Sequence, residues 1–387
     1  MNALRDTLFR MAIPRLAGTT GEADVREYLC AELEQLGLPV EREAFTFSRF
    51  NVDVLSRLGI VATAMLLVWN GTLYARGSSW LILPTLLTIS VMVAITQWHR
   101  YFDRFLRVGT LLRSENIIAR LPTCNPQQAT RNTLLILMAH YDSKSSSLPI
   151  WPRMLMVLAT LILTGFLCAV FLIIGVLRWF GFDNFSSLWS WLCAIDVVLL
   201  LALLFNRTGN RSPGAFDNAC GVAAVLETAR RLKESPPMNV DVWCVFTGAE
   251  EFGLCGAVAF LERHSLDKQQ TYLLNLDTPF TPKGAIYYNR SFGLPAQKTS
   301  ASLNHYLLAA AEKVGVTVKP FHLPLGVAAD HVPFVRHGYH AACLVAPTLL
   351  IHSPHDAPER VPLEALEQVV QICVGVAREL ENATHDT

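Results

Sequence analysis

Charged residues are scarce in this sequence of 387 residues. Only 17% of them are Asp, Glu, Lys or Arg, and 52% are hydrophobic, whereas a soluble globular protein usually carries about 25% charged residues. The shortage is concentrated in Leu55–Trp98 and Met154–Phe205, and the rest of the chain has the charge of an ordinary soluble domain. A purely soluble protein is therefore not expected, and the composition predicts a chain that is partly embedded in a membrane.

The sequence also has no net charge and no pattern of cysteines that would suggest a disulfide framework. Lys and Arg together number 32, as do Asp and Glu, so the charge balance gives no reason to expect a nucleic-acid partner. The nine cysteines are odd in number, scattered and without a Cys-x-x-Cys pair, which argues against a disulfide scaffold and favours a reducing compartment. Residues 1–6 lack the apolar core of a signal peptide.

Four apolar segments are candidates for membrane-spanning helices. Met154–Leu177 is about 24 residues long without a charge, or roughly 36 Å as a helix, which is enough to cross a bilayer. Leu58–Tyr74 is the weakest candidate because it is short and contains Asn70. The remaining two are Ser187–Phe205 and Trp80–Trp98.

The short connections between these segments predict two transmembrane hairpins, at residues 55–98 and 152–206. Two hairpins return the chain to its starting side, so residues 1–54, 99–151 and 207–387 can form one domain on one side of the membrane. More arginines flank the hairpins on the side of this domain than on the opposite side, which predicts a multi-pass protein with a cytoplasmic domain. The first group is Arg57, Arg100, Arg104, Arg107, Arg113, Arg153, Arg207 and Arg211, and the second is Arg76 and Arg178.

Outside the hairpins, short β-prone runs alternate with amphipathic helical runs. This alternation is typical of an α/β sheet that is covered by helices on both faces. We expect strands at Val40–Phe47, Asn116–Leu121, Thr133–Met138, Asp241–Phe246, Tyr272–Leu276 and Ala341–Val345, and helices at Glu22–Leu36, Ala219–Lys233, Leu254–His264, Leu303–Val314 and Leu363–Leu380.

Acidic residues and histidines stand where the predicted strands end, which is where such sheets bind their ligands. Carboxylates and imidazoles are ligands suited to zinc. A hydrolytic two-zinc site needs a carboxylate that bridges the ions, two further ligands for each ion and a base for the attacking water. The residues that could supply these groups are His140, Asp142, Asp217, Glu250, Glu251, Asp277 and His352.

The positions of these residues indicate several roles. Asp142 can orient the imidazole of His140, because residues i and i+2 of an extended chain share a face. Asp217 precedes a predicted helix, and its carboxylate could bridge two ions. Glu250 and Glu251 are adjacent in a turn, so one can bind metal while the other takes the proton of the attacking water.

Longer segments around these residues carry further motifs. They are Met138–Ser143 (MAHYDS), Ser212–Val222 (SPGAFDNACGV), Gly248–Gly256 (GAEEFGLCG), Asn275–Asp277 (NLD), Ala329–Phe334 (ADHVPF) and Ile351–Asp356 (IHSPHD). Together they resemble the co-catalytic dizinc aminopeptidases of metallopeptidase family 28, which include bacterial leucyl aminopeptidases and aminopeptidase Y. The resemblance covers nearly all of the chain outside the hairpins. It implies a three-layer αβα sandwich with a mostly parallel, mixed sheet of the zinc exopeptidase type.

The resemblance also implies a role for each candidate residue and two zinc ions per chain. Asp217 would bridge the ions, and Glu250 would be the general base, with Asp142 orienting one of the histidine ligands. Asp330 and His331 match a segment that lies near the substrate in relatives. The remaining ligands would be Glu251 and His352 for one ion, and His140 and Asp277 for the other.

The function predicted from the sequence is a membrane-anchored dizinc exopeptidase that acts as an aminopeptidase. Its predicted partners are a peptide substrate and the lipid bilayer. One alternative is a glutaminyl cyclase-like acyltransferase, although such relatives usually have a tryptophan where this chain has Ile351. Another is a catalytically inactive receptor or scaffold on the same fold, although no ligand is missing here. The residue preference, carboxypeptidase activity and the oligomeric state stay open.

Overall fold

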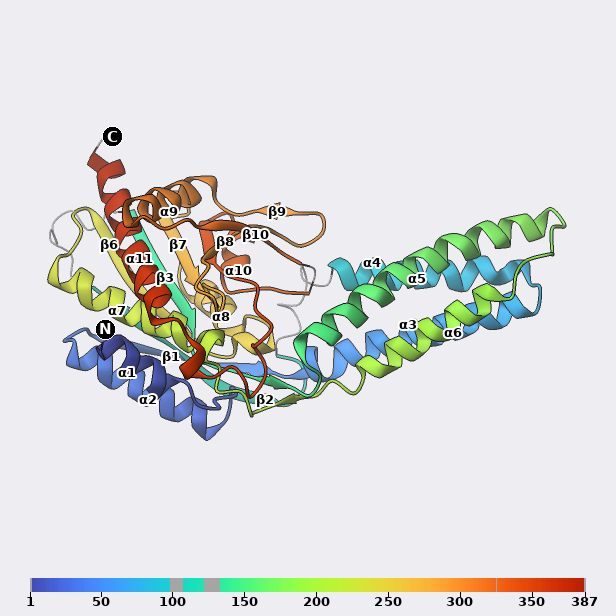
Figure 1. The fold of residues 1–387 in the computed structure, drawn as a ribbon, viewed down its shortest axis with the longest axis horizontal. Coiled ribbons are helices and arrows are strands. Elements are labelled where there is room, and N and C mark those ends of the chain that lie inside the picture. The colour runs from blue at the N-terminus through green and yellow to red at the C-terminus, as the bar shows by residue number, and fades with distance from the viewer. Residues whose placement is uncertain (1, 98–106, 122–132, 325, 386–387) are drawn as a thin grey trace. The chain divides into compact units, whose positions relative to one another are not determined.

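The computed structural model describes residues 2–97, 107–121, 133–324 and 326–385. It divides into two compact units (Figure 1). The first unit comprises Met1–Ser48, Thr110–Ser145 and Gly209–Thr387, and the second comprises Arg49–Gly109 and Ser146–Thr208. Trp98, at the end of one predicted span, and Arg100 and Arg104 lie outside the described residues.

A mixed nine-stranded sheet forms the centre of the first unit, in the order β1-β2-β6-β3-β7-β11-β8-β10 with β9 beside β8. The neighbours β6, β3, β7 and β11 are parallel to one another, whereas β1 and β2 are antiparallel additions at one edge. A separate pair joins β4 (Ser145–Ser146) to β5 (Thr208–Gly209). The strands of the large sheet are β1 (Val40–Ser48), β2 (Leu111–Arg120), β3 (Thr133–His140), β6 (Val240–Thr247), β7 (Thr271–Leu276), β8 (Tyr287–Phe292), β9 (Gln297–Lys298), β10 (Lys319–Leu323) and β11 (His340–Leu344).

Helices cover both faces of this sheet, which confirms the predicted α/β fold with a mostly parallel, mixed sheet. On one face a single hydrophobic core joins the sheet to α1 (Asn2–Met11), α2 (Thr20–Gln35), α7 (Cys220–Glu234), α9 (Ala301–Val314) and α11 (Leu363–His385). On the other face lie α8 (Cys255–Arg263) and α10 (His331–Arg336), whose Phe260 and Phe334 rings are 6.0 Å apart. Short helical turns lie at Asn51–Leu55, Ser79–Leu81, Ala215–Ala219, Glu250–Phe252 and Pro358–Arg360.

Strand β3 shows why the sheet centre reads as an apolar run. Its sequence, TLLILMAH, has no alternation of polar and apolar residues, and nearly every side chain is buried. A strand with helices on both faces has no solvated side. The same burial carries His140, the last residue of β3, into the interior, where it is 1% exposed.

Every strand and helix that we expected from the sequence in this unit is present, with ends that differ by a few residues. The expectations missed α1, α10, the strands β8, β9 and β10, and the two-residue strands β4 and β5. Strand β8 has polar residues such as Asn289 and Arg290 in its middle, and α10 has only six residues, so neither produces a clear period. Strand β2 starts at Leu111, earlier than the expected Asn116, because its first half pairs with β1.

The second unit consists of apolar helices: α3 (Ser56–Ala75), α4 (Ile82–Gln97), α5 (Ile150–Trp179) and α6 (Leu188–Leu203). Helix α3 packs against α4 and α6, and α5 packs against the same two helices, as Figure 1 shows. The segments Val52–Ala75 and Ile150–Trp179 are long and apolar enough to cross a membrane, whereas the other two helices are apolar but shorter.

Polar contacts inside this bundle join its helices. The Asn70 side chain of α3 donates to the Thr88 hydroxyl of α4 at 3.1 Å and accepts from Thr85 at 2.6 Å. Arg178, at the end of α5, donates to the main-chain oxygen of Tyr74 at 2.9 Å, and the Tyr74 hydroxyl donates to Ser186 O at 2.7 Å. The ends of α3 and α5 and the start of α6 are therefore tied together.

Candidate functional site

The candidate residues gather where the central parallel strands end. Strands β6, β3, β7 and β11 are neighbours with their carboxyl ends at one edge, since His140 pairs with Thr247 and Leu276 with Leu344. The loop after each strand delivers one part of the site. These parts are Glu250 and Glu251 after β6, His140 and Asp142 at the end of β3, Asp277 after β7 and His352 after β11, with Asp217 in the turn before α7.

Asp217 lies between the two histidines and is shared by two clusters of ligand atoms. Its Oδ1 is 3.1 Å from His140 Nε2, and its Oδ2 is 3.1 Å from His352 Nε2. His140 Nε2 is also 3.7 Å from Asp277 Oδ1, and His352 Nε2 is 3.4 Å from Glu251 Oε1. Each cluster thus offers three converging ligand atoms, and one carboxylate belongs to both.

These separations fit zinc. Two ligands about 2.0–2.1 Å from one tetrahedral zinc ion lie roughly 3.3 Å from each other. His140 Nε2 and Glu251 Oε1 are buried and have no hydrogen-bond partner among the described residues. Buried polar atoms without a partner are costly unless something else binds them. Both point toward the positions that the ligand clusters surround, and imidazole with carboxylate is a zinc donor set.

Asp142 supports three of these groups from behind. Its Oδ1 is 3.5 Å from His140 Nδ1, the ring nitrogen that faces away from Asp217. The same carboxylate accepts hydrogen bonds from the main-chain N–H of Glu250 at 3.1 Å and of Glu251 at 3.2 Å. Asp142 is fully buried, so it holds both the imidazole of His140 and the turn that carries the two glutamates.

The turn that carries Asp217 is fixed by neighbouring side chains. The Asp356 carboxylate accepts from Phe216 N at 2.6 Å and from Asp217 N at 3.3 Å. The Asn218 side chain donates to Leu276 O at 2.6 Å and thereby ties this turn to the end of β7. The peptide bond between Asp217 and Asn218 is cis.

A buried guanidinium lies beneath the same turn. Arg15 is fully buried and donates to the main-chain oxygens of Tyr141 at 2.6 Å, Gly214 at 2.8 Å and Pro213. Burial lowers the pKa of Arg15 to about 10 although nearby carboxylates, Asp356 first among them, oppose the shift. Arg15 therefore links the loop after β3 to the loop before Asp217.

Left-handed backbone conformations adjoin three of the ligand loops. Ala249, just before Glu250, has φ 53°, Thr278, just after Asp277, has φ 53°, and His352 itself has φ 60°. Such angles are strained for residues with a Cβ and persist where surrounding contacts enforce them. They aim the side chains of these loops into one space.

The electrostatics of the site separate its two glutamates. Burial raises the pKa of Glu250 well above its usual range, and Glu251, Asp277 and Asp330 add to the increase while His140 opposes it. Burial would also raise the pKa of Glu251, but Lys144 and His352 lower it to about 2. A carboxyl group with a raised pKa suits proton transfer, and an ionised one suits metal ligation.

The protonation of the two histidines follows the surrounding carboxylates. Burial alone would lower the pKa of His140, but Glu250, Asp142 and Asp217 raise it well above the ordinary value. Burial would also lower the pKa of His352, but neighbouring carboxylates, chiefly Glu251, raise it. This concentration of negative charge favours a cation at the site.

Asp330 and His331, expected near the substrate, are both fully buried. Asp330 Oδ2 accepts a hydrogen bond from the Thr247 hydroxyl, and burial raises the pKa of Asp330 to about 7. His331 Nε2 lies 2.9 Å from Asn289 Oδ1, and burial lowers its pKa to about 3. Asp330 therefore contacts the end of β6, whereas His331 contacts Asn289 of β8.

Three residues near the site were not singled out from the sequence: Lys144, Arg15 and Asp356. Lys144 Nζ is 2.6 Å from Glu251 Oε2. Asp356 falls within a quoted motif, but nothing in the motif shows that its carboxylate caps the turn of Asp217. The contacts of Arg15 and Lys144 depend on loop conformations that have no period or spacing in the sequence.

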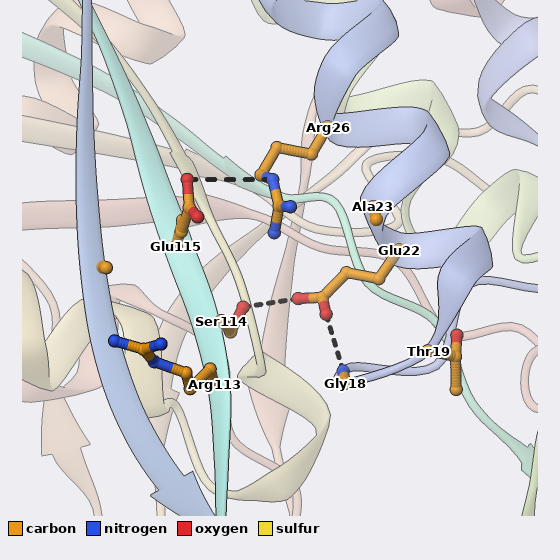
Figure 2. A pocket seen from close by; sticks show the side chains of 9 residues that line it. Gly18, Thr19, Glu22, Ala23, Arg26, Arg113, Ser114 and Glu115 are labelled. Atoms are coloured by element: carbon orange, nitrogen blue, oxygen red, sulfur yellow. Dashed lines mark hydrogen bonds and ion pairs between the residues drawn. The ribbon is translucent and has the colours of Figure 1, made fainter.

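A cavity of about 340 Å³ lies elsewhere in the first unit, between α2 and strands β1 and β2 (Figure 2). Figure 2 shows Glu22 pointing at Ser114 and Gly18, with Arg26 reaching toward Glu115. Burial raises the pKa of Glu22 to about 7. None of the predicted metal ligands lines this cavity.

The fold and the two clusters of candidate ligands agree with the predicted resemblance to zinc exopeptidases. Comparison with known proteins agrees, because residues 195–377 match peptidase family M28. This match covers just under half of the chain and agrees with the predicted resemblance to metallopeptidase family 28.

Individual proteins resemble this chain in sequence or in fold. Aminopeptidase YwaD of Bacillus subtilis is 30% identical over 180 residues, which are 43% of this chain and 38% of the relative, so the similarity spans well under half of that protein. A zinc aminopeptidase from Bacillus subtilis has a similar fold, with 16% identity, a TM-score of 0.57 and coverage of 98% of this chain and 94% of that one. A glutaminyl cyclase from Porphyromonas gingivalis shares the fold with 13% identity, a TM-score of 0.53 and coverage of 99% and 98%.

Proposed function

We propose that this chain is a membrane-anchored zinc exopeptidase that removes residues from the amino terminus of peptides and binds two zinc ions. The observation that carries the proposal is the pair of three-ligand clusters that share Asp217. His140 and Asp277 would hold one ion with Asp217, and Glu251 and His352 would hold the other. The similarity to aminopeptidases supports the choice of the amino terminus.

Bound zinc would supply Lewis acidity, which polarises the scissile carbonyl and acidifies the attacking water. Glu250 belongs to neither ligand cluster, yet its Oε2 is 4.0 Å from His140 Nε2, so it lies at the edge of the site. Its carboxylate would take a proton from the attacking water and deliver it to the leaving amine. Asp142 fixes the direction of Glu250 through the main-chain N–H.

The substitution Glu250→Gln tests this division of roles. It keeps the size of the side chain but removes the base, so we expect hydrolysis of aminoacyl substrates to fall by about 10²–10⁴-fold while zinc content stays unchanged. The exposed Glu312→Gln on α9 is the matched control and should behave as wild type. Full activity in the Glu250→Gln variant would refute the proposed mechanism.

The same assay separates the alternative functions. A panel of aminoacyl, N-blocked and N-terminal glutamine peptides, with and without a chelator, distinguishes an aminopeptidase from a carboxypeptidase and from a cyclase. The fold similarity to glutaminyl cyclases does not favour the cyclase, because Ile351 replaces the tryptophan expected of that activity. Turnover of N-terminal glutamine alone would overturn the peptidase proposal, and zinc binding without any turnover would favour a scaffold.

We further propose that α3, α4, α5 and α6 cross the membrane as two hairpins, residues 55–98 and 152–206, with the peptidase domain of residues 1–54, 99–151 and 207–387 on the cytoplasmic side. Large apolar side chains face outward along the bundle, among them Met65 at 68% exposed and Ile162 at 64%. Exposed apolar surface of this extent is characteristic of membrane contact. The arginine distribution supports the orientation.

Fractionation and reporter fusions test the membrane proposal. We expect the full chain to stay in the membrane fraction after alkaline carbonate washing, and a reporter at the carboxyl end to be active only when it is of the cytoplasmic type. Release by carbonate would contradict the spans. Activity of an exported-type reporter would contradict the orientation but not the spans.

A further inference from the structure

Lys144 lies beside one of the two ligand clusters without a role in the proposed reaction. It follows Ser143 in the loop after β3, and its side chain is 20% exposed. Its Nζ is 2.6 Å from Glu251 Oε2, and it also donates to the main-chain oxygen of Glu251 at 3.4 Å. Both contacts are with the same residue, so the ammonium group holds Glu251 at two points.

The two carboxylate oxygens of Glu251 consequently face different partners. Oε1 lies 3.4 Å from His352 Nε2, and no hydrogen bond from any described residue reaches it. Oε2 is occupied by Lys144. A carboxylate can bind a metal ion through one oxygen or through two, but here only Oε1 is directed at the ligand cluster. The contact with Lys144 therefore selects ligation through a single oxygen.

Among the described residues, the other cluster has no such cation. Asp277 is contacted by His140 at 3.7 Å and by the Thr278 hydroxyl at 3.4 Å, and no lysine or arginine within the described ranges forms an ion pair with it. An ammonium group a few ångströms from a divalent ion repels it, and this repulsion is weakly screened in a buried site. The two clusters share Asp217 but differ in their nearest positive charge.

We propose that Lys144 is a positioning residue that restricts Glu251 to ligation through Oε1 and makes the two metal positions unequal. The position formed by His140, Asp217 and Asp277 fills first, and the position that includes Glu251 and His352 binds its ion more weakly. This inference rests on the proposed function, because it assumes that the clusters bind zinc.

A zinc titration tests the inference. The full chain is purified in detergent, stripped of metal with a chelator and titrated with zinc in the presence of a chromophoric competitor. Wild type should bind zinc in two steps whose dissociation constants differ at least tenfold. In Lys144→Met, which keeps the length of the side chain without its charge, the weaker step should tighten at least tenfold. Lys144→Arg should keep the two steps, and Lys268→Met, an exposed lysine before β7, should match wild type.

The outcomes separate this inference from the proposed function. If Lys144→Met binds both ions as wild type does and stays folded by circular dichroism, the role of Lys144 is refuted while the peptidase proposal stands. If the weaker step tightens as expected but wild type hydrolyses no peptide, the role of Lys144 stands and the peptidase proposal fails. A wild-type chain that binds no zinc would overturn both.

Discussion

Replacing Asp142 by Asn perturbs the support of the site without touching a metal ligand. The fully buried carboxylate accepts from the main-chain N–H of Glu250 at 3.1 Å and of Glu251 at 3.2 Å, and it lies 3.5 Å from His140 Nδ1. An asparagine has one acceptor oxygen, so its amide group would face one of these N–H donors. At least one hydrogen bond to a charged group is therefore lost.

The size of the effect follows from these contacts. A hydrogen bond to a charged group contributes about 1.5–3 kcal/mol, so we expect Asp142→Asn to destabilise the protein by at least about 1.5 kcal/mol. The loss of an outer partner to a metal-binding histidine typically costs 10–100-fold in metal affinity, and we expect zinc affinity to fall by about that factor.

Thermal unfolding of the chelator-treated protein and competitive zinc titration measure the two effects separately. Asp24→Asn, an exposed substitution on α2, is the matched control and should change neither quantity. An Asp142→Asn protein with unchanged unfolding and zinc affinity within twofold of wild type would refute the reasoning about this carboxylate.

Two further predictions concern buried charges in the same unit. The pKa of Glu22 is raised by burial from 4.5 to about 7, so the folded state keeps a proton that the unfolded chain releases. The contribution of this group to the free energy of unfolding is full below pH 4.5 and is lost as the pH rises to 7, by up to about 3 kcal/mol. Glu22→Gln should therefore flatten this part of the profile of unfolding free energy measured from pH 4 to 8. A variant with the same slope as wild type would contradict the assignment. Arg15→Met leaves the carbonyls of Tyr141 and Gly214 without their guanidinium donor. Because each unpaired buried group costs about 1–3 kcal/mol, the variant should lose several kcal/mol of unfolding free energy in chemical denaturation. An effect below about 1 kcal/mol would show that other donors replace the guanidinium.

The convergence of the candidate ligands could be predicted from the sequence because these residues stand at the ends of strands. His140 and Asp277 directly follow apolar runs, and the carboxyl ends of neighbouring parallel strands meet at one edge. Their convergence therefore follows from topology alone. The fold class was accessible because the alternation of strands and helices is typical of a mostly parallel sheet covered on both faces.

The supporting charges could not be predicted, because their partners are set by loop conformation. Arg15 binds main-chain carbonyls of two distant loops, and any residue could supply those carbonyls. Lys144 meets Glu251 only because the loop after β3 turns toward the loop after β6. Strand β8 was missed because polar residues stand in its middle, and the contact of its buried Asn289 with His331 of α10 does not show in a local period.

The number of zinc ions bound by the detergent-purified full chain tests the central claim most directly. We expect two ions per chain in wild type. We also expect Asp217→Asn to lose both ions, because Asp217 belongs to both ligand clusters. A wild-type chain with one ion or none, or an Asp217→Asn chain that keeps two, would contradict a pair of zinc ions held by a shared carboxylate.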